Sequence, residues 1–574
     1  MLTTRKILAT ILAICMLTTV FGVSAAFADD AVFSNPGTYS ASAIGKNGEV
    51  TVTATFSETA IEAIVYQGDE TPEIGNVAMD QLKDAVLTNQ TLNVDAITGA
   101  TLSSSAFIMA LMECVEQAGG SADALNAAIE EDSVDYVTEA DVIVVGAGGA
   151  GITAAISAAE KGASVIVLEK SNFIGGNTMA AQSGINVSGS QLQKEAGIDY
   201  SIEQFVEMQT NELSRENLIT RLAEKSGETV DWLVEQGADL AMNPDREYQV
   251  KIESTDTFTT IVVIEALKKS LEASGANLYM NIRATELVTD DNNNVTGVVA
   301  VDSKGNEITF NGKAVVLATG GFGKDHARVE SLRPDFKYVT TDEIAPTTGD
   351  GLDMAVAIGA QTVDLDQLMA HPSVGIGIGM VAGNVAPGGR NIQAIIVNLN
   401  GERFFSENLY GGTPYVLEQP EGTAIMVFTE EYLNDFLRGY YQLGAVKRGE
   451  TAADLAVELG IDPDALQATV DKWNEDVANG VDTVFGRESN LNPLEGPLYA
   501  YFYNPGIHYC MGGILINEDA QVLDTEDAPI AGLYAGGEVT GGVHGTTRVD
   551  GSALTDTFTF GRIAGQSAAE YALS

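Results

Sequence analysis

A short glycine-rich turn followed by an acidic residue has the spacing of a nucleotide site. The turn is the G-x-G-x-x-G string of Gly146, Gly148 and Gly151, and Glu169 follows eighteen residues after the last glycine. Glycines at these places let the backbone approach a pyrophosphate at the start of a helix, where free N–H groups and the helix dipole favour negative charge. A carboxylate at that distance can accept hydrogen bonds from the hydroxyl groups of an adenosine ribose. The spacing therefore predicts a dinucleotide site.

The segments around this turn support the same prediction. Residues 141–145 are predicted to form a buried parallel strand, residues 152–161 an alanine-rich helix that Gly162 ends, and residues 164–168 a second strand. A glycine-rich turn alone occurs in many α/β proteins. Here strand, turn, helix, strand and acid follow one another in the order of a Rossmann unit. We therefore expect an α/β domain that binds NAD or FAD.

Further strings resemble the fumarate reductase and succinate dehydrogenase flavoprotein family. They are two loops at 175–178 and 182–184, the A-T-G-G-F string at 318–322, the G-D-G loop at 349–351 and the G-S-A-L-T-D string at 551–556. The resemblance implies that the cofactor is FAD. It also implies that this FAD is not covalently bound, because no histidine lies between 175 and 183. The residues implied to bind FAD are Gly146, Gly148, Gly149, Gly151, Glu169, Lys170, Gly176, Asn177, Thr178, Gln182, Ser183, Gly184, Asp350, Glu538, Ser552, Ala553 and Leu554.

Three polar residues match the substrate site of the same family. His371 stands in an A-H-P string, His508 in H-x-x-M-G-G, and Arg548 follows forty residues after His508, where the family has an arginine that holds a substrate carboxylate. A guanidinium group binds a carboxylate through two parallel charge-assisted bonds. It also stabilises the negative charge that develops when hydride adds to a conjugated C=C bond. The resemblance thus implies a reductase of α,β-unsaturated carboxylates with hydride from FAD, in which His371, His508 and Arg548 are catalytic.

The sequence departs from fumarate reductases at the proton donor and at the second carboxylate. No arginine occurs between Arg403 and Arg438, where the family has its proton-donating arginine, and residues 381–384 lack the family's Thr-Glu pair. We therefore expect a substrate other than fumarate, with one carboxylate and a bulkier far end, as in aryl-acrylates or urocanate. Tyr410 is the first candidate for the proton donor, since a phenol can donate to a carbanion-like centre. The alternatives are Tyr415 and Arg390.

A second cofactor is expected near the start of the chain. The D-A-I-T-G-A-T string at 95–101 resembles the D-x-x-[ST]-G-A-T motif at which a flavin transferase joins FMN to a threonine through a phosphodiester. The resemblance implies covalent FMN on Thr101, a flavin transferase as a maturation partner, and a membrane-associated electron donor, either a quinol or a flavoprotein system. From the residue types alone, the string also fits an Asp-capped turn into a helix.

The N-terminus and the composition limit the other possibilities. Residues 1–28 carry Arg5 and Lys6, then an apolar run and Ala-Phe-Ala, which predicts a cleaved signal peptide and an extracytoplasmic protein. A membrane anchor is the alternative, but no basic cluster follows the run. The formal net charge of −50 makes nucleic acid a poor partner. Only Cys114 and Cys510 lie beyond the signal, so we expect neither a C-x-x-C-H haem site nor an iron–sulfur or other metal site.

The chain of 574 residues is long enough for several domains. Alternating segments at 50–56 and 61–66 predict strands, and the apolar segment 104–118 predicts a helix. The fold class expected is α/β, with a Rossmann-type FAD domain, an inserted α+β capping domain and a preceding small α+β FMN-binding domain. The predicted parts are an FMN-binding domain at 30–118, a linker at 119–138, an FAD-binding domain at 139–360 and 505–574, and the capping domain at 361–504.

These predictions lead to one main functional hypothesis and two alternatives. The main hypothesis is an exported FMN- and FAD-containing reductase that uses an unsaturated organic acid as electron acceptor in anaerobic respiration. A flavin dehydrogenase or oxidase working in the oxidative direction could use the same FAD frame, although an oxidase needs no FMN domain. A surface electron carrier without catalysis is favoured only by the missing arginine.

Overall fold

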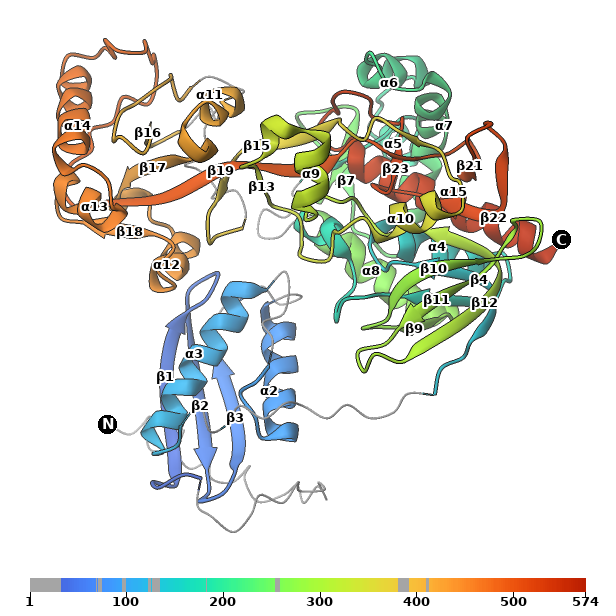
Figure 1. Ribbon diagram of the computed structural model, residues 1–574, viewed down its shortest axis with the longest axis horizontal. Coiled ribbons are helices and arrows are strands. Elements are labelled where there is room, and N and C mark those ends of the chain that lie inside the picture. Colours follow the sequence, from blue (N-terminus) through green and yellow to red (C-terminus); the bar gives the residue numbers. More distant parts are fainter. Residues whose placement is uncertain are drawn as a thin grey trace.

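The computed structural model describes residues 32–574, apart from 69, 71–74, 95–99, 122–124, 126–134, 182, 253–258, 380–391 and 409–411. The predicted signal peptide and most of the predicted linker lie outside these residues. Figure 1 shows three parts: a small N-terminal domain, a large α/β domain and an outlying third domain joined to the large one by long strands.

The small domain is a three-stranded antiparallel sheet with two helices on one face (Figure 1). Its middle strand alternates in burial because successive side chains point to opposite faces of the sheet, and Val50, Val52, Ala54 and Phe56 face the helices. The helix predicted at 104–118 begins three residues earlier, and the first strand and first helix were not expected from the sequence. The elements are β1 (Gly37–Ile44), β2 (Glu49–Phe56), β3 (Ile61–Gln67), α2 (Val77–Asn89) and α3 (Thr101–Gln117).

The large domain is built on an eight-stranded sheet in which β12, β4, β5 and β9 run parallel. Helices α4 and α15 pack on this sheet and against each other. The two helices are so close that a Cβ atom at Gly561 or Gly565 of α15 would collide with backbone oxygens of α4. The sheet contains β4 (Glu139–Val145), β5 (Val165–Leu168), β9 (Asn277–Tyr279), β10 (Arg283–Thr289), β11 (Val295–Val301), β12 (Glu307–Leu317), β21 (Gln521–Leu523) and β22 (Pro529–Ala535). The helices are α4 (Gly149–Glu160), α5 (Gln191–Glu195), α6 (Ile202–Gln209), α7 (Glu216–Glu235), α8 (Thr259–Ser274), α9 (His326–Leu332), α10 (Asp350–Ala357) and α15 (Ser552–Leu573).

Two small three-stranded sheets complete the large domain. One has the order β14-β20-β23 and the other β6-β8-β7. Their strands are β6 (Ile185–Asn186), β7 (Ala241–Met242), β8 (Gln249–Lys251), β14 (Thr362–Val363), β20 (Gly513–Leu515) and β23 (Thr540–Gly541). Since β14 pairs with β20, residues just after 361 belong to the large domain, and the capping domain begins later than predicted, along β15. A two-residue strand is too short to leave a sequence signal.

The third domain is the cap, and the 13-residue strand β19 runs from it into the large domain (Figure 1). Strands β13, β15, β17 and β18 all pair with β19, so one strand fixes the position of the cap relative to the large domain. The sheet that joins the cap to the large domain contains β13 (Thr340–Thr341), which precedes the cap in the chain, β15 (Leu368–Gly375), β16 (Ile395–Val397), β17 (Ala424–Thr429), β18 (Lys447–Gly449) and β19 (Leu498–Cys510). The helices of the cap are α11 (Thr413–Leu417), α12 (Asp435–Gln442), α13 (Ala452–Leu459) and α14 (Pro463–Ala478).

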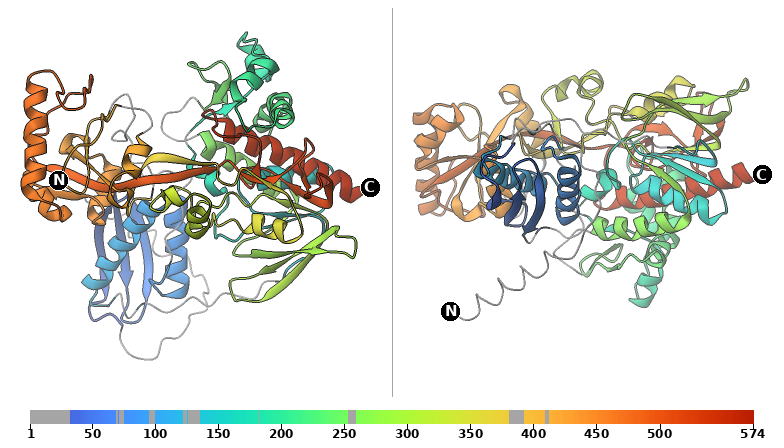
Figure 2. Two further views of the ribbon diagram at one scale, coloured as in Figure 1. Left: turned by 45° about the horizontal axis from the view of Figure 1, so that its top comes forward. Right: turned by 90° about the horizontal axis from the view of Figure 1, so that it is seen from below.

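The small domain packs against helix α12 of the cap, as both views in Figure 2 show. Leu102, at the start of α3, is buried with Leu437 and Tyr440 of α12. The backbone N–H of Ile44 donates to Oε1 of Gln442 over 3.1 Å. The contact therefore places the N-terminus of α3 against the cap.

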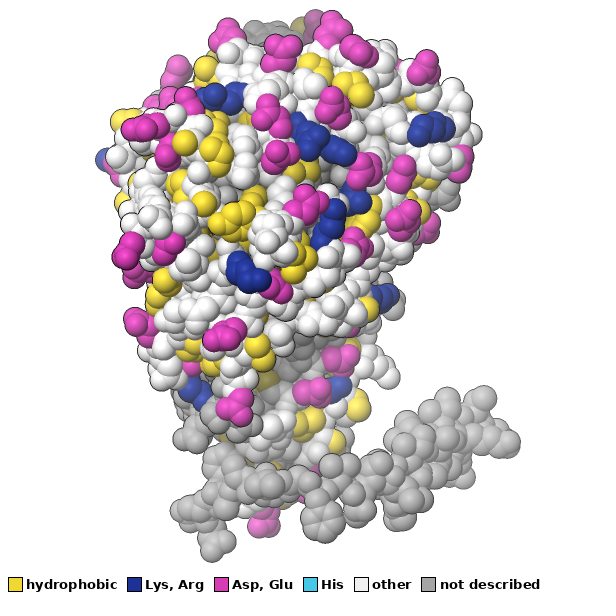
Figure 3. All heavy atoms as spheres, turned by 90° about the vertical axis from the view of Figure 1, so that its right-hand side faces the viewer, with side chains coloured by type: hydrophobic (Ala, Val, Ile, Leu, Met, Phe, Trp, Pro, Cys, Tyr) yellow, Lys and Arg dark blue, Asp and Glu magenta, His cyan; other side chains and the backbone are white. Residues whose placement is uncertain are grey.

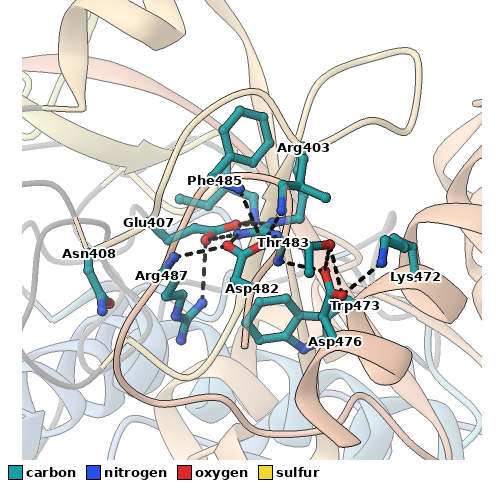
Figure 4. Close-up of polar contacts among 12 residues, drawn as sticks. Arg403, Glu407, Asn408, Lys472, Trp473, Asp476, Asp482, Thr483, Phe485 and Arg487 are labelled. Carbon is teal, nitrogen blue, oxygen red and sulfur yellow. Dashed lines mark hydrogen bonds and ion pairs between the residues drawn. The ribbon is translucent and has the colours of Figure 1, made fainter. Parts of the chain in front are cut away.

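The charged residues fall into two groups. Figure 3 shows acidic side chains spread over one end of the large domain among basic and uncharged ones, as expected for solvated surface. Inside the cap, by contrast, Arg403 binds both Glu407 (2.6 Å) and Asp482 (2.9 Å), with all three side chains buried (Figure 4). Arg487 lies beside Glu407 and donates to the backbone oxygens of Ile392 and Ala394. This cluster fixes the chain on both sides of β16. Among the described residues, no helix is both long and apolar enough to cross a membrane.

Candidate active site

A cavity of about 640 Å³ lies at the carboxyl ends of the parallel strands. Its walls come from the turns after β4, β5, β12 and β22, from the start of α15, and from β15 and β19. Parallel α/β sheets bind ligands at this edge. One cavity thus joins the predicted cofactor residues to the predicted substrate residues.

The glycine turn forms the nucleotide end of the cavity. No side chain caps α4 at Gly148, and the N–H of Gly149 donates to Oγ1 of Thr178 over 3.3 Å, so the N–H groups of Ala150 and Gly151 stay available to a ligand. A Cβ atom at Gly151 would collide with the carbonyl oxygen of Gly146, so this position requires glycine. The carboxylate of Glu169 accepts the N–H groups of Ala147 (2.7 Å) and Ser171 (2.8 Å) and lines the cavity.

The second glycine loop is connected to the opposite wall by Asn177. Its Oδ1 accepts the N–H of Ile344 (2.8 Å), and its Nδ2 donates to Thr347 (3.2 Å) and Glu538 (3.4 Å). Nearby, Lys170 forms an ion pair with Asp350 at 3.0 Å. Burial raises the pKa of Asp350, but hydrogen bonds from Arg283 and Lys170 outweigh it and hold the pKa below its usual range. These polar groups and the open helix N-terminus suit the twice-charged pyrophosphate of FAD.

Most of the residues predicted to bind FAD line this cavity. Three of them do not line it: Gly151, Gly184 and Ser552. Gly151 packs against the carbonyl oxygen of Gly146, and Gly184 packs against that of Val250. Ser552 is buried, and its hydroxyl accepts a hydrogen bond from Asn186. Gln182 lies outside the described residues. The lining members are Gly146, Gly148, Gly149, Glu169, Lys170, Gly176, Asn177, Thr178, Ser183, Asp350, Glu538, Ala553 and Leu554.

The predicted substrate residues meet at the other end of the cavity. His371 on β15 and His508 on β19 come from paired strands, and their ring centroids lie 5.2 Å apart. The guanidinium of Arg548 lies 4.8 Å from the ring centre of Tyr509. Neither Nδ1 of His371 nor Nε of Arg548 has a hydrogen-bond partner within the described part of the chain, although both are buried. Both residues line the cavity, and their unsatisfied buried atoms mark this end of it as a polar site.

Arg548 stands in a loop that Asn211 holds in place. Asn211 donates to the carbonyl oxygens of His544 (2.7 Å) and Thr547 (2.9 Å) and accepts the N–H of Thr546 (2.9 Å). Gly545 in this loop has φ +61°, and a Cβ atom there would collide with Asn211. No motif in the sequence pointed to Asn211.

Burial controls the protonation of the site. It lowers the pKa of His371 to about 4, with further lowering from His508 and Arg548, so His371 is neutral at neutral pH. Burial and Asp556 raise the pKa of Tyr509 well above its usual range, and its hydroxyl donates to Asp556 at 3.4 Å. Nδ1 of His508 lies 2.9 Å from Oδ2 of Asp342.

Two acids that the sequence analysis missed, Asp342 and Glu343, also line the cavity. Their only signal was an Asp-Glu pair just before the G-D-G loop, in a chain with 80 acidic residues. Burial raises the pKa of Glu343 well above its usual range, and the nearby charge of Glu538 raises it further. Both effects favour the protonated form of Glu343 in the folded protein.

A pH-dependent stability difference is expected between the native protein and Glu343→Gln. When the pKa of a carboxyl group is higher in the folded than in the unfolded protein, the group contributes to the free energy of unfolding. That contribution is full below the unfolded pKa of about 4.3 and is lost as the pH rises toward the folded pKa. The native protein should lose about 1.4 kcal/mol per pH unit relative to the variant over that range. Urea titrations of the FAD-loaded proteins at pH 5 and pH 8, with exposed Glu330→Gln as control, measure the difference. Parallel pH profiles for native protein and Glu343→Gln would contradict it.

The remaining predicted residues lie apart from the cavity or outside the described residues. Tyr410 and Arg390 are not described. The ring of Tyr415 on α11 is half exposed and stacks on Phe405 at 5.5 Å, and it does not line the cavity. Thr101 begins α3. The first turn of this helix has neither a capping side chain nor an acidic residue, and such a helix start can accommodate a phosphate group. The side chain of Thr101 and residues 95–99 lie outside the described part of the chain.

Comparison with known proteins agrees with this division of the chain. Residues 141–554 match the model of an FAD binding domain, and residues 45–116 match that of an FMN-binding domain. The chain is 34% identical to the urocanate reductase of Eggerthella lenta, over 93% of this chain and 92% of that one. It is 35% identical to the fumarate reductase (cytochrome) of Shewanella frigidimarina, over 75% of this chain and 77% of that one.

A solved structure shares the arrangement as well. The open conformation of a flavocytochrome c3 fumarate reductase superposes with a TM-score of 0.70 at 36% identity, covering 76% of this chain and 79% of that one. The chain therefore belongs to the fumarate reductase and succinate dehydrogenase flavoprotein family, as an FAD-dependent oxidoreductase of C=C bonds with an FMN-binding domain ahead of its FAD-binding domain.

Proposed function

We propose that the protein reduces the C=C bond of an α,β-unsaturated carboxylate that carries a single carboxylate group. The observation that carries this proposal is the shared cavity, in which FAD-binding residues continue into His371, His508 and Arg548. Relatives named as urocanate and fumarate reductases support the reaction class. When bound, FAD supplies the hydride.

Arg548 is the residue that would hold the carboxylate. Its Nε is buried and unsatisfied in the described structure, and the ring of Tyr509 supports one face of its guanidinium. A guanidinium held in this way can give two parallel bonds to a carboxylate and stabilise charge that develops on it. Neutral His371 lines the same end of the cavity.

The cations in the cavity support a substrate with one carboxylate. Among the described lining residues the arginine and lysine side chains are Arg548 and Lys170, and Lys170 is already paired with Asp350. Asp342 adds a carboxylate beside His508. A dicarboxylate would bring a second anion close to Asp342, and no second arginine or lysine among the described lining residues is free to pair with it. Like charges in a partly buried site repel each other. An aryl-acrylate or urocanate avoids this cost.

The proposal also includes the electron supply and the location of the protein. FMN joined covalently to Thr101 by a flavin transferase would receive electrons from a membrane-associated donor, a quinol or a flavoprotein system. The signal-like segment 1–28 supports export, with the reduction serving anaerobic respiration. The start of α3 lies against the cap, so FMN on Thr101 would lie beside the cap.

Reoxidation of the reduced protein by a panel of acids tests the function. The protein is reduced without oxygen and mixed with fumarate, acrylate, urocanate or a cinnamate, while flavin absorbance is followed. We expect urocanate or a cinnamate to reoxidise the flavin at least about tenfold faster than fumarate, which corresponds to about 1.4 kcal/mol, with the saturated acid as product. Faster reaction with fumarate would contradict the single-carboxylate site. Flavin reduction by a saturated acid, without reoxidation by any enoate, would indicate a dehydrogenase instead.

A further inference from the structure

Hydride addition to an enoate needs a proton donor beside the carboxylate. Hydride goes to the carbon far from the carboxylate, and the bonding electron pair moves to the carbon next to it, which must then take a proton. The donor should therefore lie near Arg548, which holds the carboxylate. The family arginine is absent from the sequence, but three groups at this end of the cavity could carry a proton: Tyr509, which contacts Arg548, and His371 and His508, whose rings lie against each other.

Two of these three groups are poor donors. Burial lowers the pKa of His371 to about 4, so this ring carries no extra proton at neutral pH. The hydroxyl of Tyr509 donates to Asp556, whose carboxylate also lies 3.1 Å from Nε2 of His544. The pKa of Tyr509 is raised, which makes its hydroxyl a weaker acid than an ordinary phenol. His508 remains.

His508 has the surroundings of a positioned acid. Its Nδ1 is 2.9 Å from Oδ2 of Asp342, and the N–H of Asp342 donates to the carbonyl oxygen of Ile507, so the carboxylate is fixed beside the ring. The ring lines the cavity, and Nε2 is the nitrogen that Asp342 does not engage. An imidazolium ring donates from both nitrogens, so a ring whose Nδ1 faces a carboxylate can still donate a proton from Nε2.

We infer that His508, positioned by Asp342, is the acid that protonates the carbon next to the substrate carboxylate; this inference rests on the proposed function. As hydride forms the new C–H bond at the far carbon, the proton on Nε2 of His508 forms the second C–H bond, and the C=C bond becomes a single bond. His508 is left neutral, with its Nδ1–H still donated to Asp342. It regains a proton from water, since about a third of its side chain is exposed.

The charges around His508 favour this cycle once the substrate is bound. Asp342 and His371 contact the ring, Arg548 lies close enough to lower the pKa of His371, and Lys324 lies close enough to Asp342 and Glu343 to interact with their charges. Arg548 disfavours a second cation nearby, but the substrate carboxylate offsets its charge. Asp342 is the carboxylate in direct contact with the ring. Binding the anionic substrate therefore stabilises the protonated state that the reaction needs.

Single-turnover oxidation of the reduced protein by a saturating enoate tests this assignment. The variants are His508→Gln, Asp342→Asn, Asp342→Glu and Tyr410→Phe, with exposed His326→Gln as the matched control. Enoate affinity for the oxidised protein is measured separately from the flavin spectrum. A titration of the histidine ring NMR signals, assigned through His508→Gln among the four histidines, gives a readout independent of turnover.

We expect His508→Gln to lower the rate by about 10²- to 10⁴-fold, the range for loss of a general acid. Its enoate affinity should change by no more than about tenfold, because glutamine can still donate one neutral hydrogen bond. Asp342→Asn should shift the fall of the rate with rising pH, and the titration of the His508 ring, to lower pH by about one unit or more. Asp342→Glu should restore part of the native pH dependence of the rate and part of the native ring titration.

Several outcomes would overturn the assignment. A near-native rate in His508→Gln, or a loss in Tyr410→Phe as large as that in His508→Gln, would do so. An unchanged His508 titration in Asp342→Asn would also overturn it, even if no enoate reacts. Failure of every enoate with the native protein would instead contradict the proposed function.

Discussion

Replacing Thr101 by alanine is expected to remove all covalently bound flavin from the protein. The D-x-x-[ST]-G-A-T motif ends at this threonine, which begins α3 where free N–H groups can receive a phosphate. After coexpression with a flavin transferase, denatured native protein should keep FMN fluorescence and the variant should show none. Acid precipitation should release FAD from both proteins, since FAD is expected to be non-covalent.

The controls separate the attachment site from general damage to the domain. Ser105→Ala changes a hydroxyl one helical turn further along α3 and should keep the FMN. Turnover with an external electron donor should fall to background in Thr101→Ala, while single-turnover reaction of dithionite-reduced FAD should be unaffected. Fluorescence that persists in Thr101→Ala, or that is absent from the native protein, would show that the attachment site is wrong.

Replacing Arg548 by alanine is expected to abolish most of the reductase activity without loss of FAD. Truncating one partner of a buried charge contact costs about 2–5 kcal/mol, much of it because the other charge is left unpaired. Here that charge is the substrate carboxylate, so kcat/KM should fall by about 30-fold to 5,000-fold. Steady-state kinetics with the best enoate measure the loss, and the flavin spectrum checks FAD content.

Arg548→Lys distinguishes the bidentate contact of a guanidinium with the carboxylate from the effect of a positive charge alone. Lysine keeps the positive charge but cannot give two parallel bonds or stack flat on Tyr509, so it should recover only part of the activity. Arg562→Lys, at an arginine on α15 that pairs with Glu228 away from the cavity, is the matched control and should be near native. Near-native turnover in Arg548→Ala would exclude the carboxylate role.

The cofactor end of the site could be predicted well from local sequence. The glycines of the first turn and Glu169 lie within one strand–helix–strand unit, so their positions follow from short-range geometry. The cap boundary was harder, because β14 joins the large domain by pairing with β20, about 150 residues later in the chain. Such a short pairing leaves no periodicity to detect.

The sequence by itself determined the order of the FMN- and FAD-binding regions and predicted three substrate-side residues, because each inference rests on residues close together in a motif. Only the tertiary structure decided how these residues act together. It brought Asp342 against His508 and Asn211 under the loop of Arg548, through pairings between strands and loops more than 150 residues apart. It also decided which histidine is neutral, because burial of a ring and its distance from other charges arise only when the chain is packed.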